Sequence, residues 1–120
     1  MAVAAITADF ATAWLETLPR GELALLYKHS PRCGTSLLAA EEVEAFALQE
    51  PELPIYRLDV VRQHALSTDL ARTLGVPHAS PQVILLRGAD PVWHTSHQRI
   101  RAATLAEHLD AARRATPAAG

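Results

Sequence analysis

Cys33, the single cysteine of this 120-residue sequence, is the residue whose type and position most favour chemistry. It follows a short apolar run, residues 23–27, and opens a helical pattern that extends to residue 50. At the first turn of a helix, free backbone N–H groups and the helix dipole stabilise a thiolate and lower the thiol pKa. The sequence therefore predicts a nucleophile for thiol–disulfide exchange, with a buried, unreactive cysteine as the alternative.

The neighbours of Cys33 fit that role better than they fit a core. Arg32 and His29 are close enough in sequence to add positive potential near the sulfur, with a neutral, hydrogen-bonded loop histidine as the alternative for His29. Gly34 leaves the approach to the sulfur uncluttered, and the Ser36 hydroxyl, about one turn along, can donate to a thiolate. Together with Thr35, these residues are predicted to form the surface that receives a thiol substrate.

A second signal is Ser80-Pro81, directly before the apolar run 83–86. Proline cannot donate to a sheet ladder, so its place beside a strand calls for a reason, and a cis peptide bond is one. From the residues alone, an ordinary loop proline is the simpler interpretation.

The histidines give weaker signals. His94 and His97 form a His-x-x-His pair that could join Cys33 around zinc, but this spacing is common and no metal site is predicted. The other histidines apart from His29 are expected at the surface: His64, His78 and His108.

The elements that must position these residues follow from hydrophobic periodicity. Helices are expected at 7–18, with Thr7 as cap and Phe10 on the buried face, and at 33–50, about 66–74 and around 105–112; strands are expected at 23–27, 55–60, 83–86 and 91–95. Strands joined through helices should pair in parallel, and the last two, joined by a tight turn, antiparallel. This order predicts an α/β fold with a four-stranded mixed sheet flanked by helices.

The composition and charge of the sequence indicate the class of protein. The sequence is 49% hydrophobic and 20% charged, which is typical of one globular domain, here 1–115, followed by a flexible tail, 116–120. The net charge of −2 and scattered arginines argue against nucleic-acid binding. No run is long enough for a membrane span, and 1–6 is too short for a signal peptide. A cytoplasmic monomer is expected.

Four blocks of residues resemble a known family. They are Lys28–Ser36 (KHSPRCGTS), Leu58–Val60 (LDV), His78–Val83 (HASPQV) and Val92–His97 (VWHTSH). The element order and a Cys-x-x-Ser motif are similar to those of the thioredoxin superfamily. More closely, the blocks resemble the YtxJ-like monothiol bacilliredoxins, over roughly Phe10 to Leu109.

The resemblance implies a thioredoxin-like fold, a cis bond before Pro81 and a place for His97 in the fold or on the active-site face. It also implies an activity: Cys33 would take bacillithiol from protein mixed disulfides. The partners would then be bacillithiolated proteins and a free low-molecular-weight thiol, with bacillithiol as co-substrate and no tightly bound cofactor.

One departure from the family keeps an alternative open. The family commonly has proline after the cysteine, where this sequence has Gly34. Cys33-Gly34-Thr35-Ser36 is also similar to the Cys-Gly-Phe-Ser motif of monothiol glutaredoxins, which hold a [2Fe–2S] cluster with glutathione. A dimeric cluster-binding module, with one Cys33 from each chain, is therefore the second hypothesis. The third is a non-catalytic thioredoxin-like interaction domain.

Overall fold

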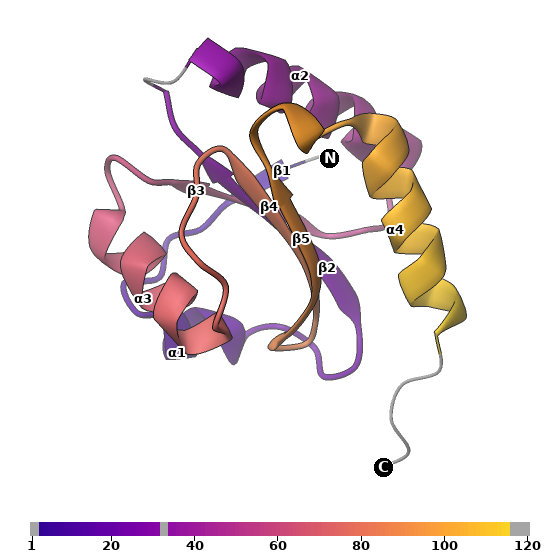
Figure 1. The fold of residues 1–120 in the computed structure, drawn as a ribbon. Coiled ribbons are helices and arrows are strands. Elements are labelled where there is room, and N and C mark those ends of the chain that lie inside the picture. Colours follow the sequence, from indigo (N-terminus) through magenta and orange to yellow (C-terminus); the bar gives the residue numbers. More distant parts are fainter. Residues whose placement is uncertain (1–2, 32–33, 116–120) are drawn as a thin grey trace.

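The computed structural model describes residues 3–31 and 34–115, which form a five-stranded mixed sheet with helices on both faces (Figure 1). The elements in chain order are β1 (Val3–Ala5), α1 (Ala11–Leu15), β2 (Leu23–His29), α2 (Gly34–Gln49), β3 (Ile55–Asp59), α3 (His64–Leu74), β4 (Gln82–Arg87), β5 (Asp90–Ser96), the 3-10 turn η1 (His97–Arg99) and α4 (Ala102–Arg114). The predicted α/β class with a mixed sheet is confirmed.

The sheet has five strands, one more than the four predicted. The sheet order is β1-β3-β2-β4-β5, and β1 pairs in parallel with β3 through Val3–Ala5 alongside Ile55–Arg57. A strand of three residues is too short to show an alternating pattern, so the apolar start of the chain gave no strand signal. The antiparallel β4–β5 hairpin and the edge position of Pro91 are as predicted.

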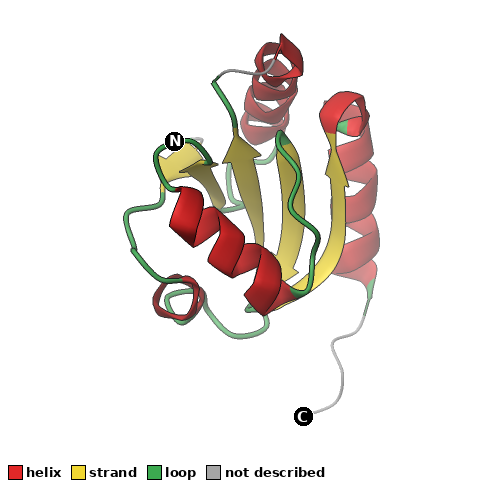
Figure 2. Ribbon diagram, turned by 60° about the vertical axis from the view of Figure 1, so that its left-hand side comes forward, coloured by secondary structure: helices red, strands yellow, loops and turns green. Residues whose placement is uncertain are grey.

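The direction of β4 also differs from the prediction. β3 runs parallel to β2, but β4 runs antiparallel to it, with Lys28 opposite Gln82 and Leu23 opposite Arg87. The reason is the connection after α3. Segment 75–81 runs back along the sheet after the helix ends, so β4 starts beside the carboxyl end of β2 (Figure 2). The helix therefore does not complete a parallel crossover.

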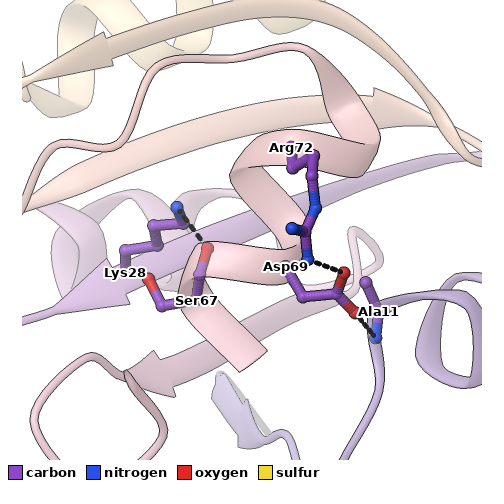
Figure 3. Close-up of polar contacts among 5 residues, drawn as sticks. All are labelled: Ala11, Lys28, Ser67, Asp69 and Arg72. Atoms are coloured by element: carbon purple, nitrogen blue, oxygen red, sulfur yellow. Dashed lines mark hydrogen bonds and ion pairs between the residues drawn. The ribbon is translucent and has the colours of Figure 1, made fainter. Parts of the chain in front are cut away.

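The first helix spans Ala11–Leu15 and is shorter at both ends than the predicted 7–18; at its amino end, a side chain of another helix holds the first N–H group. α1 begins at Ala11, whose backbone N–H donates to Asp69 Oδ2 of α3 at 3.0 Å (Figure 3). Thr7 therefore lies outside the helix, and Phe10 is 67% exposed rather than packed. Trp14 is buried as predicted.

Two apolar clusters hold the layers together, one on each face of the sheet. The cluster beneath α1 and α3 includes Trp14, Leu26, Leu58, Leu70 and Ile84. The cluster beneath α2 and α4 includes Leu25, Val43, Phe46, Val83 and Leu109. Figure 2 shows the two pairs of helices on opposite faces of the sheet. No helix in residues 3–31 and 34–115 is both long and apolar enough to cross a membrane.

The Asp69 contact yields a stability prediction. Hydrogen bonds from the Ala11 N–H and the Arg72 side chain lower the pKa of Asp69. The contribution of the carboxylate to stability is therefore complete above its ordinary pKa and is lost as the pH falls through the lowered one. Asp69→Ala should lower the urea midpoint at pH 7 and weaken the acid dependence, whereas the exposed Asp110→Ala should not lower the midpoint. Equal midpoints for both variants would contradict the capping role.

Candidate active site

The predicted site residues that the structure describes gather at one end of the sheet. His29 ends β2, Gly34 begins α2, and Pro81 precedes β4. The pairing of Lys28 with Gln82 sets Pro81 beside the end of β2. The pairing of Gln82 with Ser96 brings the end of β5, and with it His97, to the same place. Cys33 and Arg32 lie outside the described residues, between His29 and Gly34 in the chain.

The first turn of α2 presents a buried hydroxyl next to the cysteine in sequence. Ser36 is 2% exposed, and its Oγ has no hydrogen-bond partner within the described part of the chain. Thr35 is half-buried and Gly34 is exposed. A Cβ added at Gly34 would meet no atom within 4 Å, so packing does not demand glycine there. A buried hydroxyl without a described partner is unusual and is suited to donate to an acceptor in the adjoining loop.

The Ser80–Pro81 peptide bond is cis, as the resemblance implied and contrary to the simpler interpretation from the residues. The carbonyl of Pro81 accepts a hydrogen bond from the His97 backbone N–H at 3.0 Å. His97 adopts a positive φ of 56°, which is uncommon outside glycine, and its Nδ1 lies 3.0 Å from Ser96 Oγ. The backbone therefore links His97 to segment 75–81, here called the proline loop, and the imidazole of His97 stays exposed.

His29 is held by its neighbour in β2. Its Nδ1 lies 2.8 Å from the Tyr27 hydroxyl. Burial raises the pKa of Tyr27 to about 12, so the phenol keeps its proton and shares a hydrogen bond with the imidazole of His29. Burial, followed by the Arg57 charge, lowers the pKa of His29, while Asp59 opposes the shift. Burial and the Arg57 charge both disfavour the protonated ring, and the contact with Tyr27 is the kind that a neutral, hydrogen-bonded histidine makes.

Lys28 is the feature that the sequence interpretation missed. It is the only lysine in the sequence, and its side chain is completely buried. Its Nζ lies 3.3 Å from the Ser67 carbonyl oxygen of α3 and 3.4 Å from His78 Nδ1, while Ser67 Oγ lies 3.3 Å from the same Nδ1 (Figure 3 shows the first of these contacts). The ammonium group therefore joins β2, α3 and the loop that leads to Pro81.

A signal for Lys28 existed in the sequence. Residues alternate between faces along a strand, so Lys28 shares the face of Leu26, which is buried beneath α3. His78, expected at the surface, has an exposed ring whose Nδ1 nevertheless faces Lys28 and Ser67. The alternation predicts the direction of the lysine side chain, but its partners depend on the path of segment 75–81.

The remaining histidines do not form a cluster in the described residues. His64 is exposed as predicted, but His108 is half-buried and stacks on Trp93, with ring centroids 4.0 Å apart. His94 is exposed. Across residues 3–31 and 34–115, no group of three or more His, Cys, Asp or Glu side chains is placed to share a metal ion.

The buried Ser36 hydroxyl gives a prediction about the cysteine. Ser36→Ala should change the free energy of unfolding by less than about 1 kcal/mol, because no described hydrogen bond is lost. It should raise the pKa of the Cys33 thiol by about 0.5 to 1, the equivalent of one hydrogen bond to the thiolate. The pH dependence of iodoacetamide alkylation measures this, and the buried Ser67→Ala is the matched control. An unchanged alkylation profile in Ser36→Ala would refute the donor role.

Lys28 permits a direct titration, because one lysine gives one set of lysine NMR signals. Burial lowers its pKa from 10.5 to about 8, which the ¹³Cε shift of lysine-labelled protein should report. Between these two values the unfolded chain binds more protons than the folded chain. The stability should therefore rise with pH across that window, by up to about 3 kcal/mol.

Lys28→Met is the control for that titration, since methionine has a similar length and no charge. The variant should be more stable than the parent at pH 7 and should lack the rise between pH 8 and 10.5. A lysine signal that titrates near 10.5, or parallel stability profiles for the two proteins, would show that Lys28 is solvated.

Comparison with known proteins agrees with this geometry. A solved structure described as having a thioredoxin fold superposes with a TM-score of 0.77 at 24% identity, covering 88% of this chain and 92% of that one. Fasciola hepatica thioredoxin gives 0.68 at 23% identity, covering 92% and 98%. A mutant thioredoxin from Halobacterium salinarum gives 0.74 at 15% identity, covering 97% and 95%. The fold is therefore that of thioredoxin. The family described as monothiol bacilliredoxin BrxC matches residues 11–105, and the chain belongs to this family.

Proposed function

We propose that this chain is a thiol–disulfide oxidoreductase that removes a low-molecular-weight thiol, bacillithiol first among the candidates, from mixed disulfides on proteins. The observation that carries the proposal is the match to the monothiol bacilliredoxin family over residues 11–105. The position of Cys33, the residue before α2 in a thioredoxin fold, supports it. The proposed setting is the cytoplasm, with the protein acting as a monomer.

The proposed reaction has two exchange steps. The Cys33 thiolate attacks the sulfur of the small thiol, a new S–S bond forms, and the old one breaks. The target protein leaves as a thiolate and takes a proton from solvent. Cys33 then carries the small thiol as a mixed disulfide. Because the sequence has no second cysteine, a free thiolate from solution attacks the small-thiol sulfur and releases Cys33, leaving a low-molecular-weight disulfide.

The described residues support specific roles in these steps. α2 extends from Gly34 to Gln49, and the positive end of its dipole favours a thiolate at its start. The buried Ser36 hydroxyl is proposed to donate to that thiolate. Ser80 and Pro81 lie beside the carboxyl end of β2 and are proposed to contact the incoming disulfide. Arg32, Thr35 and His97 complete the proposed substrate surface.

The experiment is intact-mass analysis of the purified protein after exposure to bacillithiol disulfide or glutathione disulfide, then after excess free thiol. We expect one adduct per chain, removed by the free thiol, and no adduct on Cys33→Ser. The disulfide that reacts faster identifies the preferred small thiol. An iron–sulfur chromophore after anaerobic reconstitution, together with no adduct, would favour the cluster-binding alternative. No adduct and no chromophore would favour the interaction domain.

A further inference from the structure

A charged groove lies at the carboxyl end of β2, beside Pro31. Its volume is about 380 Å³, and its lining includes His29, Pro31, Arg57, Asp59, Arg62 and Gln63. The pairing of His29 with Asp59 places the ends of β2 and β3 side by side along it. Pro31 is two residues before Cys33 in the chain, so the groove adjoins the start of the segment that carries the reacting cysteine. The volume lies in the range of small-molecule sites.

The wall of the groove that follows β3 is fixed by hydrogen bonds. Asp59 Oδ1 accepts the backbone N–H groups of Val61 at 2.9 Å and Arg62 at 3.1 Å. These bonds, that from Arg62 foremost, lower the pKa of Asp59, so the carboxylate is ionised and engaged at neutral pH. Gln63 accepts the Asp59 N–H and donates to the Ile6 carbonyl at 2.8 Å. The turn is therefore built before any ligand arrives.

The arginine side chains of the groove differ from Asp59 and Gln63, because they act on their neighbours through charge, as Arg62 does on Asp59. Neither the Arg57 nor the Arg62 guanidinium forms an ion pair or a hydrogen bond with any of the residues that the structure describes. Arg57 is close enough to His29 to lower its pKa. The lining thus carries two guanidinium groups against one carboxylate that its own turn already engages, so the groove has a net positive charge and several N–H donors.

We infer that this groove binds the carboxylate-bearing part of the low-molecular-weight thiol while its sulfur exchanges with Cys33. Guanidinium groups bind carboxylates through paired, charge-assisted hydrogen bonds, which suits a small anionic thiol better than a neutral or cationic one. The inference rests on the proposed function and deepens it, because it assigns the charge class of the thiol and the residues that select it.

The test compares two disulfides and three variants. Rates of adduct formation on Cys33 are measured at low salt with glutathione disulfide, which carries carboxylates, and with bis(2-hydroxyethyl) disulfide, which is uncharged. The rate with glutathione disulfide divided by the rate with bis(2-hydroxyethyl) disulfide is a ratio in which any change in the reactivity of the thiol itself cancels. We expect this ratio to fall about five- to tenfold in the double variant Arg57→Gln/Arg62→Gln, and less in Arg62→Gln alone. Arg99→Gln, an exposed arginine at the same end of the sheet but outside the groove, should leave the ratio unchanged within about twofold.

Two results would overturn the inference. One is an unchanged ratio in the double variant, and the other is an equal fall in Arg99→Gln, which would assign the effect to general surface charge. In both cases adducts still form, so the proposed function survives. If no disulfide reacts, the proposed function fails. The groove is then judged by NMR titration with unreactive S-methylglutathione: shifts of the Arg57, Asp59 and Arg62 amides that disappear in the double variant support it, and their absence refutes it.

Discussion

The burial of the Lys28 ammonium group constrains the whole end of the sheet where the candidate site lies. An ion removed from water needs polar partners, and Lys28 finds them in the Ser67 carbonyl of α3 and in His78. No apolar side chain could unite β2, α3 and segment 75–81 with the same directionality. The position of the proline loop is thus tied to the strand that leads into Cys33.

The site depends on strand register as much as on any single side chain. β2 is central, with β3 on one side and β4 on the other, so its carboxyl end is the meeting point of three loops. Pairing with β4 supplies Pro81, pairing with β3 supplies the turn at Asp59, and the hairpin to β5 supplies His97. A slip of one residue in a pairing would turn the side chains of that strand to the opposite face and separate these contributions.

The sequence predicts the elements that depend mainly on neighbouring residues. The helix that begins after Cys33, the central strands and the β4–β5 hairpin follow from periodicity and turn residues, and Gly75 ends α3 in a left-handed conformation as its type suggests. The differences from the prediction concern features that depend on contacts between distant parts of the chain. The direction of β4 depends on the path of segment 75–81, and the start of α1 depends on Asp69. The lowered pKa of His29 likewise depends on its burial and on Arg57 in the adjoining strand.

The unique, buried lysine also has a consequence for how this protein meets other molecules. All other basic side chains that carry a fixed charge are arginines, so the ε-amino chemistry that a protein surface normally offers is confined to one inaccessible atom. A lysine-specific endoprotease has a single target bond, which lies at the end of a central strand. Cleavage there requires the strand to leave the sheet. The rate of cleavage would therefore report how often the core opens beside the segment that carries Cys33.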